Sequence, residues 1–381
     1  MTIFLLIFLL LFILPDLYIS LVLMRGAAWW SHLLLWLPAL TAIGLLASIR
    51  FGGLSSGKMD AFTALLLCVA FPQVFFLVIS LLGWLLSLFN FHYSSFFNYA
   101  GIVAGAIVFA AMLYGLTCGW KRLNVKHVDL TFDDLPASFE GYKLAQLSDL
   151  HVGSYGTNTA FLEKVVKRVN DEQADLVVFT GDMINTTPTE IAPFEQTLSG
   201  LRAKDGVLSV LGNHDYCLYG FGERPSDPRE GAWQVVQAER RMGWDVLLNE
   251  HRLIRRGNDS IAIVGVENTG KPPFPEIGDL RGAMAGLRDS TFRILLSHDP
   301  SHWRMEVLPK TNIPLMLAGH THAAQFKIGS WSPSTWMYSE WSGLYQEGNQ
   351  RLYVSEGTGG SIPFRLGATP EIIVFTLHRA K

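Results

Sequence analysis

The sequence predicts a chain in two parts: a transmembrane region of about four helices over residues 1–122, and a soluble α/β domain over residues 123–381. The mean hydropathy of +0.26 is high for a soluble protein. Charge is concentrated in the second part, because three of the 30 Lys and Arg and two of the 33 Asp and Glu precede Lys121. From about Val125, short apolar runs alternate with amphipathic helical patterns, which is typical of a layered α/β or α+β domain. This composition excludes a disordered chain, a collagen-like repeat and a disulfide scaffold.

Four apolar stretches are each long enough to cross a bilayer, which takes about 20 helical residues. The first is not expected to be a cleavable signal peptide, because it has no basic segment before it and no small-residue cleavage site after it. The four stretches lie near Ile3–Leu23, Ala27–Ser48, Ala61–Phe89 and Tyr99–Trp120. We therefore predict a multi-pass integral membrane protein.

The basic residues predict the orientation of these helices. One side carries five of them, Arg50, Lys58, Lys121, Arg122 and Lys126, whereas the other side carries Arg25. Positive residues gather on the cytoplasmic side of membrane proteins. Both termini and the soluble domain are therefore expected in the cytoplasm. Cys217 is the single cysteine of that domain, so no disulfide is expected within it.

Asp16 is the one carboxylate inside a predicted span, and an intramembrane charge is a functional candidate by default. It follows Pro15, and no basic residue lies in another span to pair with it. We interpret it as a hydrogen-bonding group between packed helices or at a kink. The helices are then an anchor, with a lipid-handling groove as the alternative.

In the soluble part, eight apolar runs predict strands and four amphipathic segments predict helices. The predicted strands are Lys143–Leu147, Leu176–Thr180, Val207–Leu211, Ile261–Val266, Phe292–Leu296, Leu315–Leu317, Leu352–Val354 and Glu371–Leu377. The predicted helices are Ala160–Asn170, Pro193–Ala203, Gly231–Met242 and Leu280–Leu287.

Polar motifs follow five of these strands. They are Ser148-Asp149-Leu150-His151, Gly181-Asp182, Gly212-Asn213-His214-Asp215, Ser297-His298-Asp299 and Gly319-His320-Thr321-His322. In open α/β sheets, ligand sites form at the carboxyl ends of strands, where the loops converge. Taken singly, Asp182 could cap a turn and His298 could be a core histidine. Their shared placement after strands favours one common site.

This donor set has a chemical meaning. It offers carboxylate, amide and imidazole donors and no thiolate, which suits Mn²⁺, Fe or Zn²⁺ better than a structural zinc site or a calcium cage. A carboxylate placed between two ions, such as Asp182, can bridge a pair of metals about 3.5–4 Å apart. The mild negative charge of the soluble part, with no basic block, argues against a nucleic-acid partner.

The order of these motifs resembles the calcineurin-like metallophosphoesterases, from about Tyr142 to the C-terminus. Further similarities point to the membrane-associated subfamily related to UDP-2,3-diacylglucosamine pyrophosphatases. They are Gly141-Tyr142-Lys143, Leu352-Tyr353-Val354, Gly357-Thr358-Gly359 and Pro370-Glu371-Ile372. The resemblance implies two mixed β-sheets sandwiched by helices. One departure concerns substrate choice: where the family motif continues with two glycines, this chain has Ala323 and Ala324.

The resemblance also implies roles for the motif residues. One metal would be held by Asp149, His151 and His322, and a second by Asn213, His298 and His320, with Asp182 bridging them. A hydroxide shared by the two divalent ions would attack phosphorus in line. His214 would face the leaving oxygen, oriented by Asp215. Arg365 is a candidate clamp for a substrate phosphate, with a packing role as the alternative.

The segment between the last histidine motif and the next strand is rich in aromatic residues: Trp331, Trp336, Tyr338, Trp341 and Tyr345. Such a density packs a small core, or it forms an interfacial platform for a lipid-bearing substrate. Both interpretations stay open from the sequence.

These observations favour a membrane-anchored dinuclear hydrolase, with Mn²⁺ as the expected metal, that cleaves a phosphodiester or pyrophosphate in a phosphate-bearing small molecule or lipid. One alternative is a phosphomonoesterase or protein phosphatase. A second is a non-catalytic membrane sensor that binds a phosphorylated ligand. The enzyme is favoured over the sensor because Asp182, Asn213 and His214, which a degenerate relative would lose, are all present.

Overall fold

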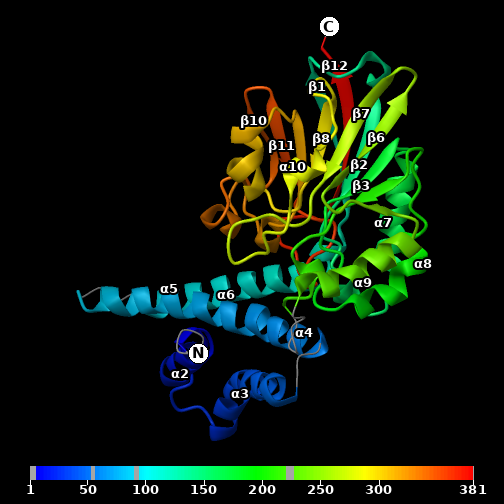
Figure 1. Ribbon diagram of the computed structural model, residues 1–381. Helices are drawn as coiled ribbons and strands as arrows, with labels where there is room; N and C mark the ends of the chain where they lie inside the picture. Colours follow the sequence, from blue (N-terminus) through cyan, green and yellow to red (C-terminus); the bar gives the residue numbers. More distant parts are fainter. Residues whose placement is uncertain (1–5, 53–55, 90–93, 220–226, 381) are drawn as a thin grey trace. The chain divides into compact units, whose positions relative to one another are not determined.

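The computed structural model describes residues 6–52, 56–89, 94–219 and 227–380. By internal contacts the chain divides into two compact units, Met1–Cys118 and Gly119–Lys381. The first unit is helical, and the second contains all the strands of the described chain (Figure 1).

The first unit holds the apolar helices. Its elements are η1 (Leu9–Ile13), α2 (Leu14–Val22), α3 (Trp29–Gly52), α4 (Ser56–Leu65), η2 (Leu66–Ala70), α5 (Phe71–Ser87) and α6 (Ser94–Thr117). Three continuous helical stretches, Trp29–Phe51, Gly57–Ser87 and Ser95–Lys121, are long and apolar enough to cross a membrane, and Leu6–Val22 is a shorter apolar helix. The four predicted stretches are therefore helices, although the start of the first lies outside the described residues.

Asp16 has the packing environment expected of a hydrogen-bonding group between helices. Its side chain is buried, and Nε2 of Gln73 in α5 donates to its Oδ1 at 2.8 Å. Close by in the same unit, the hydroxyl groups of Tyr18 and Ser80 lie 2.9 Å apart. A few paired polar side chains thus join apolar helices, as is common where helices pack in a membrane.

The second unit contains two six-stranded mixed sheets. The first has the order β1-β12-β2-β3-β4-β5, in which β12 runs antiparallel to β2. Its strands are β1 (Asn124–Phe132), β2 (Tyr142–Leu147), β3 (Leu176–Phe179), β4 (Val207–Ser209), β5 (Asp245–Val246) and β12 (Glu371–Arg379). The second has the order β10-β11-β9-β8-β7-β6. Its strands are β6 (Glu250–Arg256), β7 (Asp259–Gly265), β8 (Phe292–Leu296), β9 (Leu315–Ala318), β10 (Gly343–Glu347) and β11 (Gln350–Val354).

Helices cover the outer faces of both sheets (Figure 1). Apolar residues of α7 (Ala160–Asp171) and α9 (Pro228–Arg241) pack on the first sheet. On the second sheet, α10 (Leu280–Ala283) and the turn η8 (Trp303–Val307) form a separate cluster. A third cluster lies between the sheets and includes Leu144, Ile294 and Phe375. The two remaining short helices are α8 (Glu195–Leu198) and α11 (Leu308–Lys310). The expected arrangement of two mixed sheets between helices is confirmed.

All eight predicted strands are present, and the sequence missed four: β1, β5, β6 and β10. These four are the edge strands of the two sheets. An edge strand is half exposed and carries polar residues, so it lacks the continuous apolar run of an interior strand. Two predicted helices are shorter than expected: Pro193–Ala203 is largely replaced by the 3₁₀ turn η6 (Pro188–Phe194) and α8, and Leu280–Leu287 ends at Ala283.

Parallel pairing decides where the polar motifs lie. In the first sheet β2, β3 and β4 are mutually parallel, and in the second β8, β9 and β11 are. Their carboxyl ends therefore share one edge of the domain. The loops there are joined by backbone hydrogen bonds, for example from Asp149 N to Gly181 O at 2.9 Å and from Gly319 N to His298 O at 2.9 Å.

Candidate metal centre

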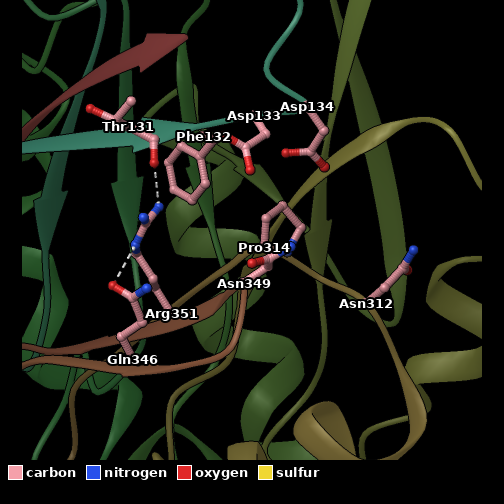
Figure 2. Close-up of a pocket in the computed structure, with 9 residues that line it drawn as sticks. All are labelled: Thr131, Phe132, Asp133, Asp134, Asn312, Pro314, Gln346, Asn349 and Arg351. Atoms are coloured by element: carbon pink, nitrogen blue, oxygen red, sulfur yellow. Dashed lines mark hydrogen bonds between the residues drawn. The ribbon is translucent and has the colours of Figure 1, made fainter. Parts of the chain in front are cut away.

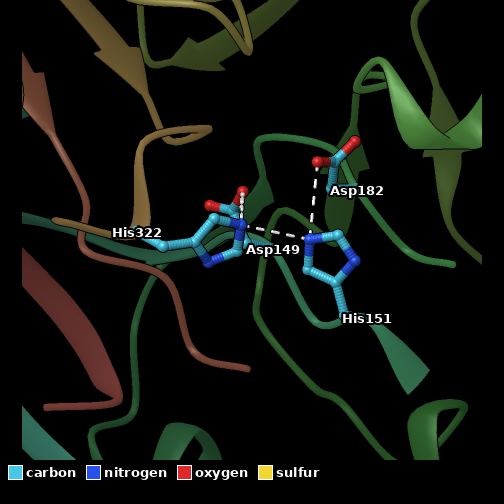
Figure 3. A group of neighbouring side chains, drawn as sticks. All are labelled: Asp149, His151, Asp182 and His322. Carbon is cyan, nitrogen blue, oxygen red and sulfur yellow. Dashed lines mark hydrogen bonds and ion pairs between the residues drawn. The ribbon is translucent and has the colours of Figure 1, made fainter. Parts of the chain in front are cut away.

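Among the described residues, two overlapping groups of side chains that could hold a metal ion lie at this edge. In each, one ligand atom from every member lies within 4.8 Å of the others. The first group contains Asp149, His151, Asp182 and His322 (Figure 3), and the second contains Asp182, His298 and His320. Asp182 belongs to both. The residues come from loops after β2, β3, β8 and β9, as the sequence predicted.

In the first group, imidazole nitrogens and carboxylate oxygens converge on one point. Nε2 of His151 and Nε2 of His322 face one another at 3.1 Å. Nε2 of His322 lies 3.2 Å from Oδ1 of Asp149, and Nε2 of His151 lies 3.5 Å from Oδ2 of Asp182 (Figure 3). Asp149, His151 and Asp182 are almost completely buried. Imidazole nitrogens and carboxylate oxygens that converge in this way are potential ligands of one divalent cation.

The second group is built on the other side of the same carboxylate. Oδ2 of Asp182 lies 3.2 Å from Nε2 of His298, and Nδ1 of His320 lies 3.2 Å from that same His298 nitrogen. The oxygen that faces His151 therefore also faces His298. This is the position that a bridging carboxylate requires.

The buried amide of Asn213 lines the same hollow as Asp182 and His320. Its Nδ2 donates to the hydroxyl of Tyr219 at 2.9 Å, but no donor in the described part of the chain reaches its Oδ1. A buried acceptor without a donor is rare in folded proteins. An oxygen of this kind is a suitable ligand for a hard divalent cation. The donor set thus fits the metals expected from the sequence.

The outer nitrogen of each of two ligand histidines faces a hydrogen-bond acceptor. Nδ1 of His151 lies 3.1 Å from Ile184 O and 3.0 Å from Oδ1 of Asn185. Nδ1 of His298 lies 2.7 Å from Thr180 O. Each Nδ1 therefore carries a hydrogen and donates. In the neutral ring of His151 the lone pair is then on Nε2, which points into the centre. Such contacts fix the orientation of metal-binding imidazoles.

Burial sets the charge state of three histidines. It lowers the pKa of His151 to about 3 and the pKa of His320 to about 4, and it holds the pKa of His322 well below its usual value. His298 differs, because burial lowers its pKa but the carboxylates of Asp182 and Asp149 outweigh burial and raise it to about 10. The three neutral rings are already in the form that binds a metal.

Asp182 stays ionised for the reciprocal reason. Burial would raise its pKa, but the imidazoles of His298, His214 and His151 outweigh that effect and hold its pKa well below the ordinary value. A buried carboxylate that remains charged is a strong ligand. Binding of a cation here would displace the proton of His298, because a ligating imidazole must give up that proton.

The loops reach this geometry through left-handed backbone. Positive φ angles occur at Asp149 (54°), His151 (45°), Asp182 (62°), His320 (75°) and His322 (51°). Non-glycine residues rarely adopt this conformation, and it clusters at functional sites. Gly212 packs directly against Asp182, and a Cβ at position 212 would overlap Oδ1 of Asp182, so glycine is required there.

His214 lies beside the two groups and does not belong to either. Its ring contacts that of His151 edge to face, with centroids 4.8 Å apart, and its backbone N–H donates to Oδ1 of Asp182 at 2.8 Å. Its Nδ1 lies 2.7 Å from Asn185 O. Nδ1 therefore donates to that carbonyl, and Nε2 remains for a ligand.

Asp215 does not orient His214 in the way the sequence predicted. Its buried carboxylate accepts four backbone N–H groups: those of Asp182 at 2.9 Å, Met183 at 2.8 Å, Ile184 at 3.3 Å and Gly212 at 2.8 Å. The hydrogen-bond acceptor at Nδ1 of His214 is Asn185 O, at 2.7 Å. Asp215 instead fixes two loops against each other.

Arg365 is also placed differently from the predicted phosphate clamp. Its side chain is 1% exposed, and its Nη1 donates to Glu356 O at 2.6 Å and to His322 O at 3.2 Å. Its Nη2 donates to Gly359 O and lies 3.4 Å from Nδ1 of His322. The guanidinium is committed to backbone carbonyls, so the packing alternative describes it and the clamp does not.

The loop with the two alanines keeps a backbone that glycine adopts freely. Ala323 and Ala324 both have φ 49°. Ala323 is buried, and Ala324 is exposed and lines the hollow in front of the metal groups. Of the two extra methyl groups, the one on Ala324 therefore faces the space that a substrate enters.

That hollow has a volume of about 370 Å³. Its inner wall is polar and consists of Asp182, Asn213, His214, His320 and His322. Its outer wall is mainly aromatic and apolar, with Tyr219, Phe274, Trp336, Met337 and Tyr338. A ligand with a polar group attached to an apolar body matches this division.

A second hollow, of about 250 Å³, lies at the opposite ends of the strands (Figure 2). Pro314 and Asn349, which precede β9 and β11, line it. Arg351 lines one side of this hollow. Its Nη1 donates to Thr131 O at 2.7 Å, and its Nε donates to Oε1 of Gln346 at 3.3 Å. It shares no residue with the candidate metal centre.

The geometry places candidate ligands for divalent metals at the carboxyl edge of two packed sheets, as in a metal-dependent enzyme. Comparison with known sequences agrees. Residues 142–324 match the family model for the calcineurin-like phosphoesterase domain. Residues 1–120 match the model described as the probable transmembrane domain of calcineurin-like phosphoesterases.

Individual relatives extend this result. An uncharacterized metallophosphoesterase of Bacillus subtilis is 32% identical over 292 residues, which are 72% of this chain and 94% of that protein. A transmembrane protein with a metallophosphoesterase domain from Danio rerio is 28% identical over 289 residues, and the chain spans 62% of its length. A UDP-2,3-diacylglucosamine pyrophosphatase of Chlamydia trachomatis is 25% identical over 290 residues, covering 63% of this chain and 85% of that protein.

The chain belongs to the calcineurin-like phosphoesterase family. It is a metallophosphoesterase with a transmembrane region, and the expected family and fold are confirmed.

Two residues that contact the predicted ligands were not identified from the sequence. Asn185 faces His151 through its side chain and His214 through its carbonyl group. The hydroxyl of Tyr338 lies 2.6 Å from Nε2 of His320. Tyr338 belongs to the aromatic segment described from the sequence. Nothing in its position along the chain indicated a contact with His320. Asn185 lies three residues after Asp182. This closeness in sequence to a predicted ligand is the feature that could have identified it.

Tyr338→Phe tests the contact with His320. Loss of an outer partner of a metal-binding histidine typically weakens metal affinity by about 10–100-fold. We expect the affinity for one of the two ions to fall within this range, measured by competition with a metal chelator. Tyr353→Phe, a buried tyrosine between the sheets, is the matched control. Equal affinities in both variants would show that Tyr338 does not support the ligand.

Proposed function

We propose that this enzyme is a dinuclear metal-dependent phosphoesterase that hydrolyses a phosphodiester or pyrophosphate bond in a lipid-linked substrate. The observation that carries the proposal is the shared oxygen of Asp182. Oδ2 lies 3.5 Å from Nε2 of His151 and 3.2 Å from Nε2 of His298, so one carboxylate serves two groups of donors.

The residues divide into two ligand sets. Asp149, His151 and His322 would hold one ion, and Asn213, His298 and His320 the other, with Asp182 between them. Bound divalent ions make water a nucleophile near neutral pH and neutralise the charge that develops on the phosphoryl oxygens. Oxygen and imidazole donors without a thiolate suit Mn²⁺, Fe or Zn²⁺, and of these we expect Mn²⁺.

His214 is the proposed proton donor to the leaving oxygen. It lines the hollow, and the bond from its Nδ1 to Asn185 O fixes the ring so that Nε2 is the free nitrogen. A positioned imidazole of this kind contributes about 10²–10⁴-fold to a rate. Asp215 acts indirectly, because its four N–H bonds fix the loops that carry Asp182 and His214.

Two observations support a lipid-linked substrate. The outer wall of the hollow is apolar while its floor is a candidate phosphate site. In addition, the related protein of Chlamydia trachomatis is named for cleavage of UDP-2,3-diacylglucosamine, a nucleotide-linked lipid.

We further propose that the enzymatic domain lies in the cytoplasm. The support is the distribution of basic residues, with Arg50, Lys58, Lys121, Arg122 and Lys126 on one side and Arg25 on the other. Cytoplasmic loops of membrane proteins carry such an excess.

The first test compares hydrolysis of bis-p-nitrophenyl phosphate with that of p-nitrophenyl phosphate by the detergent-purified protein with Mn²⁺. We expect diester cleavage, and we expect Asp182→Asn to lower it by about two orders of magnitude or more, because both ions lose a ligand. Asp289→Asn, at a fully exposed carboxylate, should retain the wild-type rate. Cleavage of the monoester alone would support a phosphomonoesterase instead.

A second test addresses His214 through the leaving group. For a diester with a phenol or alkyl leaving group, His214→Ala should lower kcat by about 10²-fold or more, because these groups need a proton. When the leaving group is p-nitrophenolate, a weakly basic anion that needs no proton, His214→Ala should lower kcat by less than about 10-fold. An equal loss for all leaving groups would contradict the role of proton donor.

A third test locates the domain. In a chain with Cys68→Ser, Cys118→Ser and Cys217→Ser, a new cysteine at the exposed position Asp289→Cys reports access to solvent. If the domain is cytoplasmic, a membrane-impermeant maleimide labels this cysteine after the cells are lysed, and labelling of intact cells stays near that of the cysteine-free chain. Efficient labelling of intact cells would place the domain outside.

A further inference from the structure

An exposed apolar surface lies at the mouth of the hollow. It consists of Ile328, Trp331, Trp336 and Met337, which are 64%, 39%, 77% and 66% exposed, and we call these four residues the apolar rim. Trp331 and Trp336 pack edge to face with ring centroids 5.7 Å apart. Large exposed tryptophans beside a binding site mark an interaction surface.

The rim is continuous with the candidate metal centre. Trp336 and Met337 line the hollow, together with His320 and His322. The next residue, Tyr338, contacts Nε2 of His320. A molecule bound to the apolar rim would therefore also be next to His320 and His322 of the candidate metal centre.

The segment that carries the rim suits an apolar medium. The eleven residues from Ile328 to Tyr338 include no Asp, Glu, Lys or Arg. Backbone N–H groups of Ile328 and Trp331 donate to each other's carbonyl oxygens at 2.9 and 3.1 Å. Hydroxyl groups are likewise used internally, from Ser332 to Ala323 O at 2.6 Å and from Thr335 to Ser332 O at 2.8 Å. Polar groups that are already paired cost little to remove from water.

The attachment point of the domain favours a bilayer as the occupant. The second unit begins at Gly119, directly after the membrane unit. Within it, Trp120 packs on Tyr155 and Phe161 with ring centroids 5.8 and 5.9 Å away. Tyr155 ends the short turn η5 (Val152–Tyr155), which begins directly after His151. The chain thus enters the domain beside the loops of the metal centre, at the carboxyl edge where the rim also lies.

We propose that the apolar rim inserts into the bilayer interface and that the substrate phosphate enters the hollow directly from it. This extends the proposed function, because it makes the substrate a membrane-resident amphiphile with its apolar part held along the rim. Tryptophan and methionine side chains fit the boundary between headgroups and acyl chains, which lies about 5–10 Å inside the surface. A second copy of the chain or a soluble protein on this surface is the competing occupant.

Depth-dependent quenching in lipid nanodiscs tests this docking. The full chain without its native cysteines carries Trp336→Cys, labelled with an environment-sensitive fluorophore, in nanodiscs made with or without doxyl-labelled lipids. We expect doxyl lipids to quench this probe strongly, as for a group at the boundary between headgroups and acyl chains. Met337→Cys is a second exposed position and should give the same result.

Asp289→Cys is the matched control, because this exposed residue precedes β8 and so lies at the other end of the strands. It should be quenched little. Equal quenching at positions 289 and 336 would overturn the proposal. A probe at 336 shielded from solvent without doxyl quenching would also overturn it, in favour of a protein occupant. Because the readout is fluorescence, an enzyme that docks but cleaves no diester would contradict the proposed function and leave the docking intact.

Discussion

The structure of the site depends on one buried charge, the carboxylate of Asp182. It is 1% exposed, and such a charge is tolerated when opposite charges and donors surround it. Oδ1 accepts the backbone N–H of His214, and Oδ2 faces His151 and His298. The imidazoles from separate loops are thus arranged around one anion. Removal of that anion would take away the carboxylate oxygen that faces Nε2 of both His151 and His298.

A second buried carboxylate allows the loops to carry this arrangement. Asp149, His151, Asp182, His320 and His322 all have left-handed backbone, which costs about 1–3 kcal/mol at each such residue. The four N–H groups that Asp215 accepts, and the loop-to-loop bonds from Asp149 and Gly319, oppose that cost. The two carboxylates therefore have different roles. Asp182 faces the imidazoles of His151 and His298, whereas Asp215 fixes the backbone of the loops that carry Asp182 and His214.

The sequence predicted the interior of the domain better than its margins. Interior strands such as β3 and β9 are continuous apolar runs, because both faces are covered. Edge strands such as β1 and β6 mix charge with apolar residues, so their pairing is decided by neighbours that the sequence does not reveal. The same contrast holds at the site. Residues directly after apolar strands, such as Asp182 and His298, could be predicted because their strands place them at the shared edge. The partners of Asp215 and Arg365 depend on how loops distant in sequence fold against one another, and no local pattern reports that.

The loop after His322 has a consequence for how such proteins are recognised. Ala323 and Ala324 adopt the left-handed turn that two glycines would take without strain, both with φ 49°, and the bond from Ala324 N to Thr321 O at 2.8 Å keeps the turn closed. At positions 323 and 324 the left-handed backbone conformation is therefore present without the glycines that usually adopt it. A search pattern that demands glycine there would pass over this chain, whereas a search on backbone torsions would find it.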